Sequence, residues 1–179
     1  MSHSQNNSYA TLETERLTLR MWRESDIDEY ASICADPHVM RPMGRGPMDR
    51  GEAWRNMAMV IGHWHLRGYG LWAVEERASG ALIGRIGCWQ PEGWPGFEVG
   101  WMLGSNYWGR GFATEAARAS LKYAFEELKQ THVISLINPE NLPSIRVAER
   151  LGEHYEGETE MSGVKLSIYG IEREVWAAS

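Results

Sequence analysis

The stretch WGRGFATEA, from Trp108 to Ala116, decides the fold of this chain. Gly109 and Gly111 can adopt backbone conformations that are closed to other residues, and a strongly helix-forming segment follows them directly. A hydrophobic segment with strand character, FEVGWML (97–103), lies just upstream. Because a strand, a glycine turn and a helix start bring backbone N–H groups together, the stretch predicts a phosphate or pyrophosphate site. The alternative is a tight connection whose glycines only relieve strain.

A second segment of the same kind lies downstream. NPENLPSIRVAERLG, from Asn138 to Gly152, reads as a strand end followed by a short capped helix. The glycine turn lacks the Lys-Ser/Thr ending of a nucleotide P-loop, and no acidic residue stands where it would hold a ribose. Antiparallel strands are also expected before the turn. These features disfavour a nucleotide-binding α/β domain, nucleotide hydrolysis and hydride transfer.

With both segments, the chain resembles the GNAT superfamily of acyl-CoA-dependent N-acetyltransferases, and most closely its ribosomal-protein-alanine acetyltransferase (RimJ/RimL-like) branch. The resemblance runs from ETERLTLRMW (13–22) to YGIEREVW (169–176) and so covers almost the whole chain. It implies acetyl-CoA as co-substrate and a primary amine as acceptor, either a protein or peptide N-terminus or a small molecule. It also implies direct attack of the amine on the thioester, without a covalent enzyme intermediate.

Length and composition agree with one enzyme domain. The chain has 179 residues, of which 43% are hydrophobic, and can bury one sizeable core. We expect a flexible polar tail over residues 1–10 and a single domain over 11–179. The sequence contains no apolar run of membrane-spanning length and no secretion signal, which predicts a cytoplasmic protein without a membrane partner. A homodimer is left open.

Charge and metal-binding residues narrow the partners further. A net charge of −6 argues against nucleic acid and is compatible with cationic amines. Cys34 and Cys88 lie far apart and read as reduced, partly buried thiols. The six histidines show no ligand spacing, and we therefore expect no metal.

The expected fold class is α/β (α+β), because strand and helix patterns are mixed along the chain. The resemblance implies a mixed, mostly antiparallel sheet with a central splayed parallel pair, flanked by helices. We expect Ser25 to cap the first helix and Asp49 the second, whose apolar positions Trp54, Met57, Val60, Ile61 and Trp64 read as core. The expected strands are 16–22, 71–76, 81–89, 97–103, 132–137 and a terminal hairpin; the expected helices are 25–35, 49–67, 111–128 and the one after Asn141.

In the resembling family the pantetheine arm enters the gap between the two parallel strands and pairs with strand backbone as an added strand would. The glycine turn then holds the pyrophosphate. The expected cofactor-binding residues are Trp101, Met102, Leu103, Trp108, Gly109, Arg110, Gly111, Phe112, Ala113, Thr114 and Asn141.

Amide formation requires a base for the amine proton, and we favour Glu98 on the strand before the turn. There its carboxylate can face the thioester directly or through a water; an exposed strand residue is an equally weighted alternative. Glu115, one turn into the next helix, reads as a carboxylate that favours the helix dipole without catalysis. Glu98 also distinguishes an enzyme from a second class, a non-catalytic acyl-CoA-binding sensor or interaction module of the same fold.

The helix after Asn141 departs from the superfamily pattern. Many GNAT enzymes carry a tyrosine there that protonates the leaving thiolate, and this chain has Ala148 in that register. Ser144 lies three residues after Asn141, so the two share a helix face. The resemblance implies that Ser144 hydrogen-bonds the sulfur as a catalytic group and that Asn141 touches the pantetheine. Both can equally serve as helix caps.

The resemblance places the acceptor between the loop from His38 to Met48 and the hairpin arm from Glu153 to Val164. Acidic residues on the arm are typical of a solvated surface or of a site for a cationic acceptor, whereas arginines near the opposite loop can hold a carboxylate. The sequence therefore leaves open an amine that carries an anionic group. Tryptophans on this side can add aromatic walls around an amine. The acidic residues are Glu153, Glu156, Glu158 and Glu160, the arginines are Arg41, Arg45 and Arg50, and the tryptophans are Trp64, Trp89 and Trp94.

Overall fold

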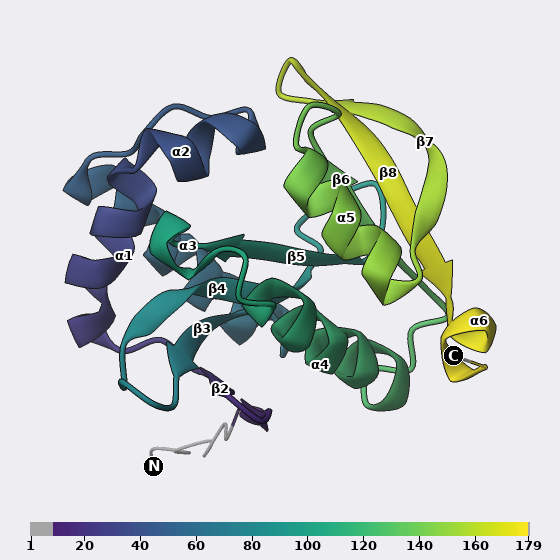
Figure 1. Cartoon of the computed structure of the whole chain (residues 1–179), viewed down its shortest axis with the longest axis horizontal. Coiled ribbons are helices and arrows are strands. Elements are labelled where there is room, and N and C mark those ends of the chain that lie inside the picture. The colour runs from purple at the N-terminus through teal and green to yellow at the C-terminus, as the bar shows by residue number, and fades with distance from the viewer. Residues whose placement is uncertain (1–8, 179) are drawn as a thin grey trace, which may run out of the picture.

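The computed structural model describes residues 9–178 and contains an eight-stranded sheet with helices on both faces (Figure 1). The strands lie in the order β1-β2-β3-β4-β5-β6-β8-β7. β5 and β6 run parallel, and the other neighbouring pairs run antiparallel. The expected fold class is confirmed. The strands are β1 Leu12–Glu13, β2 Leu17–Arg20, β3 Leu71–Glu76, β4 Leu82–Trp89, β5 Glu98–Leu103, β6 His132–Ile137, β7 His154–Met161 and β8 Val164–Glu172.

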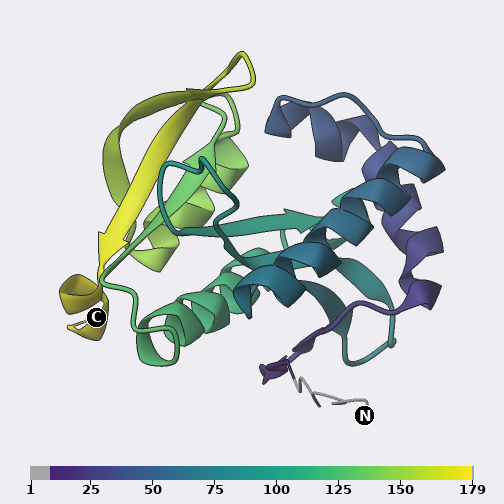
Figure 2. The same ribbon diagram turned by 180° about the vertical axis from the view of Figure 1, so that it is seen from behind.

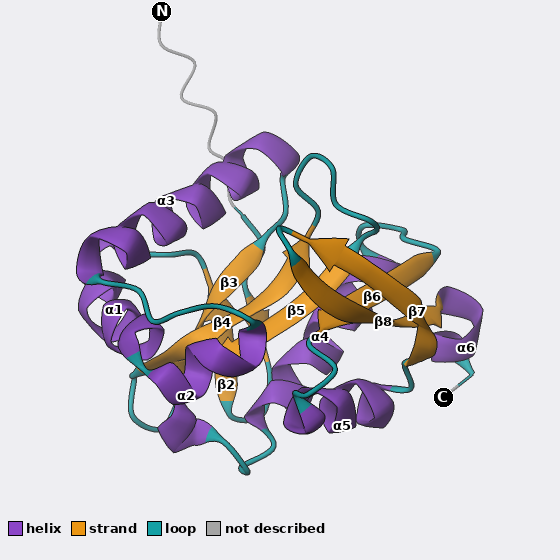
Figure 3. Cartoon of the chain, turned by 90° about the horizontal axis from the view of Figure 1, so that it is seen from above, coloured by secondary structure: helices purple, strands orange, loops and turns teal. Residues whose placement is uncertain are grey.

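Two layers of helices enclose the sheet. α4 and α5 lie on one face and α3 covers the other, as the views from the front, from behind and from above show (Figures 1, 2 and 3). α1 packs against α3 and β4. The helices are α1 Ile27–Ala35, α2 Pro37–Met40, α3 Arg50–Arg67, α4 Phe112–Glu126, α5 Leu142–Leu151 and α6 Arg173–Ala177, with 3-10 turns at Glu24–Asp26, Arg41–Met43 and Ser105–Tyr107.

The core lies between the sheet and these helices, and α3 shows how the sequence fills it. Met57, Val60 and Trp64 are buried, as expected from their spacing. Trp54 and Ile61 were expected in the same stripe but are 55% and 37% exposed. Each directly follows a buried residue and is rotated from it by about 100° around the helix. The buried face of the helix is therefore narrower than the apolar pattern in the sequence suggests.

The ends of α3 follow the sequence signals closely. The Asp49 side chain accepts a hydrogen bond from the Glu52 backbone N–H, and the Glu52 side chain accepts one from that of Asp49. This reciprocal pair satisfies N–H groups that the helix leaves free. Gly68 ends the helix in the left-handed conformation at φ 78°. The expected Asp49 cap is confirmed.

The start of the chain differs from expectation. Ser25 does not cap the first helix; it lies inside a 3-10 turn that precedes α1. The carboxylate of Asp26 accepts the Arg23 backbone N–H and two hydrogen bonds from the Arg20 side chain, which places this turn against β2. A buried ion pair therefore replaces the expected cap. β1, α2 and α6 are short elements that the sequence pattern did not indicate.

The last two residues of the expected tail contact the domain, whereas residues 1–8 lie outside the described part. Tyr9 packs edge-on against Trp64 at 5.4 Å between ring centroids. The Ala10 carbonyl accepts a 2.7 Å hydrogen bond from the Trp72 indole. Within residues 9–178, no helix combines the length and apolarity needed to cross a membrane.

The parallel strands separate soon after they meet. In the described chain β5 and β6 share one registered pair, Glu98 with Ile134, and the Ile134 N–H donates to the Phe97 carbonyl at 2.8 Å. Farther along, side chains replace strand pairing: the Ser135 hydroxyl lies 2.8 Å from the Val99 carbonyl, and the Leu136 N–H bonds the Glu98 carboxylate. β5 therefore has an unpaired edge from about Gly100 onward. This is the splayed parallel pair that the resemblance implied.

Candidate functional site

Two cavities adjoin where the parallel strands separate. The larger, about 940 Å³, lies between the end of β5, the glycine turn and α5, within the usual size range of ligand pockets. The smaller, about 160 Å³, lies on the other side of the gap and contains Glu98. A small molecule bound in one cavity can therefore contact a chemical group that is held at the adjoining end of the other cavity. The residues that line both are Pro42, Met43, Trp101, Asn141 and Ser144.

The glycine turn forms one wall of the larger cavity. Gly109 and Gly111 have φ values of 73° and 82°, in the left-handed region that favours glycine. Gly111 is the N-cap of α4, and no side chain caps its N–H groups. Free N–H groups at the start of a 15-residue helix form an anion site. The geometry fits the pyrophosphate that the sequence predicted here, and Trp108, Phe112, Ala113 and Thr114 line the same cavity.

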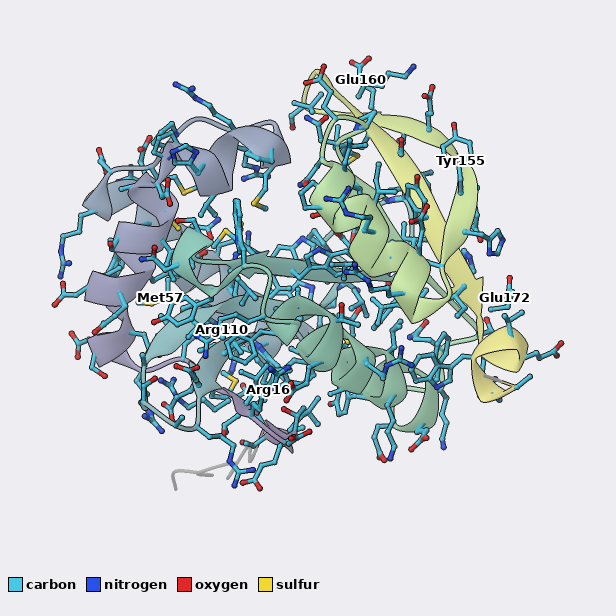
Figure 4. All side chains as sticks on the ribbon, viewed as in Figure 1. Arg16, Met57, Arg110, Tyr155, Glu160 and Glu172 are labelled. Carbon is cyan, nitrogen blue, oxygen red and sulfur yellow. The ribbon has the colours of Figure 1, made fainter. Side chains whose placement is uncertain are left out.

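The Arg110 side chain does not line this cavity, although the sequence placed Arg110 among the cofactor-binding residues. Its guanidinium pairs with Glu76 at 2.6 Å and stacks on the Phe112 ring at 4.4 Å. Arg16 lies beside it at the start of α4 (Figure 4) and pairs with Glu115 at 2.6 Å. The Arg110 guanidinium is therefore engaged by Glu76 and Phe112 outside this cavity. Glu115 lines the cavity, and its carboxylate also accepts hydrogen bonds from the Thr14 hydroxyl and the Arg16 backbone N–H.

Three other arginines face the larger cavity and were missed by sequence reasoning. Arg118 extends from α4, and Arg146 and Arg150 extend from α5. The Arg118 guanidinium donates to the Arg150 carbonyl at 3.0 Å, which ties the two helices together. Positive charge on facing helix surfaces suits a polyanionic ligand. Arginines at these positions look like ordinary exposed helix residues in the sequence, and only the packing of α4 against α5 brings them together.

The unpaired edge of β5 completes the larger cavity. Trp101, Met102 and Leu103 line it and have no strand partner on the β6 side, although the Leu103 carbonyl accepts a 2.9 Å hydrogen bond from the Trp108 indole. β4 pairs with all three on the other side. Backbone polar groups without partners are costly unless a ligand or water satisfies them. An extended chain with amide groups, such as pantetheine, fits this edge as an added strand.

Glu98 is the acidic residue of the smaller cavity. Its side chain is 9% exposed, and its carboxylate accepts a 2.6 Å hydrogen bond from the Trp94 indole. Burial raises the pKa of Glu98 to about 7, although the hydrogen bonds from Trp94 and Leu136 and the charges of Arg85 and Arg45 act in the opposite direction. A carboxyl with a pKa near neutral can accept a proton from an ammonium group and release it again. Glu98 faces the cavity, and the alternative of an exposed strand residue is wrong.

A second buried carboxyl, Glu153, lies behind β6. It was expected on the solvated hairpin arm, yet it is 3% exposed and precedes β7. Its Oε1 lies 3.1 Å from the Ser135 hydroxyl, and its Oε2 has no hydrogen-bond partner. Burial, with smaller contributions from the negative charges of Glu98 and Glu156, raises the pKa of Glu153 to about 8, although the contact with Ser135 acts in the opposite direction. Because the single Ser135 proton is shared with the Val99 carbonyl, protonated Glu153 is the form that suits this contact.

Ser144 lies at the junction of the two cavities. Its hydroxyl oxygen accepts a 3.3 Å hydrogen bond from the Trp101 indole, which leaves the hydroxyl proton free to donate. Asn141 is the N-cap of α5: its Oδ1 accepts from the Ser144 backbone N–H at 3.2 Å, and its Nδ2 donates to the Pro42 carbonyl at 3.4 Å. The expected cap is present, and both side chains also line the cavities. Ala148 is fully buried and lines neither cavity.

The loop over the smaller cavity is partly helical, because α2 and the turn Arg41–Met43 replace the expected irregular chain. A Cβ at Gly44 would come within 2.7 Å of Val164, so loop and terminal hairpin are close enough here to favour glycine. Of the three arginines singled out on this side, Arg45 lines the cavity, whereas Arg50 pairs with Asp28 and Arg41 is exposed.

Of the aromatic and acidic residues that were expected around the acceptor, some line the smaller cavity and others do not. Trp89 and Trp94 line the smaller cavity, but Trp64 is fully buried in the core and donates to the Leu71 carbonyl. On the hairpin, Glu158 pairs with Lys165, and Glu160 extends from its far end (Figure 4). The acidic arm is therefore a solvated and partly neutralised surface rather than a wall of the cavity.

The comparisons with known proteins agree with this geometry. Residues 16–154 match the acetyltransferase (GNAT) domain family, and the chain belongs to that family as an N-acetyltransferase. It is 34% identical to YkkB of Bacillus subtilis (strain 168) over 91% of this chain and 96% of that protein. It is 33% identical to the uncharacterized N-acetyltransferase p20 of Bacillus licheniformis, over 82% of this chain and 84% of p20.

A solved structure gives the same result. The acetyltransferase from Agrobacterium tumefaciens str. C58 has a TM-score of 0.83 and 34% identity, covering 93% of this chain and 96% of that one. GNAT acetyltransferases use acetyl-CoA, and the larger cavity fits it: it combines a free helix start, an unpaired strand edge and three arginines. Within residues 9–178, no group of three or more His, Cys, Asp or Glu side chains could hold a metal ion.

Proposed function

We propose that this protein transfers the acetyl group of acetyl-CoA to a primary amine by direct attack, with Glu98 as the base and Ser144 as the group that stabilises the leaving sulfur. The observation that carries the proposal is the position of Glu98. Its buried carboxyl, with a pKa of about 7, faces a cavity that shares Trp101 and Ser144 with the cavity suited to the cofactor.

Acetyl-CoA supplies a thioester whose carbonyl carbon forms a bond to nitrogen while its bond to sulfur breaks. Glu98 takes a proton from the ammonium form of the acceptor and releases it to solvent, and the nitrogen loses its second proton to the departing sulfur once the bond to carbon has formed. The Ser144 hydroxyl, held by the Trp101 indole, donates a hydrogen bond to the departing sulfur. Backbone groups of Trp101–Leu103 and of the glycine turn hold the cofactor, with Asn141 positioned beside it.

Glu98→Gln tests the base. Glutamine keeps the size and can accept the Trp94 hydrogen bond but cannot take the amine proton, so we expect the rate to fall about a hundredfold or more. The deficit is largest between about pH 7, above which Glu98 is ionised, and the pKa of the amine, below which the amine is protonated. Thiol release and product mass measure turnover, and calorimetry with acetyl-CoA serves as the control because binding is expected to be unchanged. Wild-type turnover across the pH range would move the role to a water or to another group.

A second candidate is an acyl-CoA-binding sensor or interaction module of the same fold. The loss of the superfamily tyrosine at Ala148 is the observation that favours it. Stoichiometric binding of acetyl-CoA without acetyl transfer to any amine, amino acid or peptide would support the sensor. The acceptor is either a protein or peptide N-terminus, which the resemblance to the ribosomal-protein-alanine branch in the motifs from Trp108 to Ala116 and from Asn138 to Gly152 supports, or a small-molecule amine.

A further inference from the structure

The smaller cavity contains more positive than negative charge. Its described lining includes two arginines, Arg45 from the loop after α2 and Arg85 from β4, and one acidic residue, Glu98. Both arginines act on Glu98 electrostatically, which places their charges near the proposed base. Even with Glu98 ionised, as the proposed base must be, the charged residues of this lining keep one positive charge in excess.

Neither arginine has an ionic partner in residues 9–178, and this separates them from the other arginines close to the sheet. Arg20 is 7% exposed and pairs with Asp26 and Glu75, and Arg110 pairs with Glu76. Arg85 is partly buried, and its Nε is inaccessible to solvent and has no hydrogen-bond partner. A buried donor of this kind costs free energy until an acceptor satisfies it.

The position of Arg85 is fixed by the sheet. It lies in the middle of β4, opposite Ala73 of β3 and Met102 of β5. On the helical side the Arg85 guanidinium hydrogen-bonds the Tyr30 side chain of α1, whose hydroxyl donates to Asn56 of α3 at 2.6 Å, and the Arg85 charge also acts on Cys34. These neighbours are neutral, so none of them balances the guanidinium.

We infer that Arg85, with Arg45, binds a carboxylate of the acceptor, so the preferred substrate is an amine that also carries an anionic group, with an apolar remainder. A guanidinium presents a planar fork of N–H donors that matches a carboxylate. The apolar part would contact Trp89, Trp94 and Met59, which line the same cavity. This inference rests on the proposed function, because it names the acceptor of the same site.

The test compares amines that differ only in this charge. Apolar L-amino acids are each paired with their C-terminal amide and assayed by thiol release with acetyl-CoA at pH 9, where Glu98 is ionised. We expect kcat/KM at least tenfold higher for each acid than for its amide. Two hexapeptides, one beginning with Ala and one with Asp, separate a free α-carboxylate from an acidic side chain as the source of the anion.

Arg85→Gln should remove the preference by raising KM for the acids at least tenfold while leaving KM for the amides within about twofold. Arg45→Gln should have a smaller effect in the same direction, because Arg45 is exposed. The matched control is Arg41→Gln, which removes an exposed arginine from the same loop outside the cavity. Arg85→Lys keeps the charge but loses the fork, and it provides a folded comparison if Arg85→Gln unfolds; its KM for the acids should lie between those of wild type and Arg85→Gln.

Failure of this inference differs from failure of the proposed function. If the amides or the Ala-peptide react as well as the acids, and Arg85→Gln leaves KM for the acids unchanged, the carboxylate site is wrong while the transferase stands. If no amine of any kind is acetylated, although calorimetry shows acetyl-CoA binding, the proposed function itself is wrong and this inference is wrong with it.

Discussion

Single side chains set the chemistry of the smaller cavity, and Glu98 shows how. Its burial favours the neutral acid, and the hydrogen bond from Trp94 favours the carboxylate. The balance places its pKa at about 7, where a base is efficient. A small change in either contribution should therefore move the pH dependence of turnover in a direction that can be stated in advance.

Trp94→Phe removes the hydrogen bond and keeps an aromatic ring in the cavity. Because that bond lowers the pKa of Glu98, its loss should raise the pKa and move the acidic limb of kcat/KM upward by roughly 0.5–1 pH unit. Trp89→Phe is the matched control, since Trp89 lines the same cavity and stacks on His63 without bonding Glu98. An acidic limb that moves equally in both variants would show that ring size, not the hydrogen bond, is responsible.

Ser144→Ala tests the group beside the leaving sulfur. We expect turnover to slow by roughly ten- to a hundredfold, a modest effect because a thiolate leaves readily. Helix stability should change little, because Asn141 still caps α5 through the Ser144 backbone N–H. Equal rates in the two proteins, with acetyl transfer shown to be rate-limiting, would leave solvent as the partner of the sulfur.

The Ser144 result also bears on the missing tyrosine. Ala148 is fully buried and faces neither cavity, so a tyrosine there has no room to reach the sulfur in this packing. Ala148→Tyr is expected to destabilise the fold, by about 1–3 kcal/mol, rather than to rescue Ser144→Ala.

At the scale of elements, the turn before α4 combines conformation and function. The positive φ of Gly111 allows the backbone to approach a ligand closely and starts the helix without a side-chain cap. A valine at position 111 would be strained in this backbone conformation, and its side chain would block the approach of the phosphates.

Gly111→Val should weaken acetyl-CoA binding at least tenfold by calorimetry, while the domain still folds. Gly80→Val is the control: Gly80 also has a positive φ, 71°, in the β3–β4 turn with open space around it, but it does not line the cavity. If both variants lose the same affinity, backbone strain alone accounts for the effect.

The elements that the sequence predicted well are those with strong local signals. The glycine turn, α3 with its Asp49 cap and the central strands depend on short-range patterns, and the structure places them as expected. The misses depend on packing between distant segments. The burial of Glu153, the cavity position of Arg85 and the exposure of Trp54 follow from which surfaces meet, which no local spacing records.

At the scale of the whole molecule, two buried carboxyls couple folding to pH. Burial raises the pKa of Glu98 to about 7 and of Glu153 to about 8, from an ordinary value near 4.5. The folded protein then holds protons that the unfolded chain has released. Their contribution to stability is full below about pH 4.5 and is lost as pH rises through the folded values. His63, whose pKa burial lowers from an ordinary value of 6.5, acts in the opposite direction, because its contribution is lost as pH falls below that value.

Glu153→Gln isolates one of these contributions, because glutamine resembles the protonated carboxyl in shape and has no charge. We expect the variant to match the wild type near pH 5 and to melt at a higher temperature near pH 8, with about 1 kcal/mol corresponding to roughly 2–4 °C. Thermal unfolding followed by circular dichroism across this range measures the difference. Parallel stability curves for the two proteins would show that Glu153 does not hold its proton in the folded state.

The gap between β5 and β6 also makes the stability of the folded chain depend on the concentration of a ligand. Beyond the Glu98–Ile134 pair the sheet lacks a partner along one edge, and a ligand that fills it binds the folded chain alone. Such a ligand at a hundred times its dissociation constant stabilises the fold by about 2.7 kcal/mol. The lifetime of the folded protein in a cell then rises and falls with the supply of its own co-substrate.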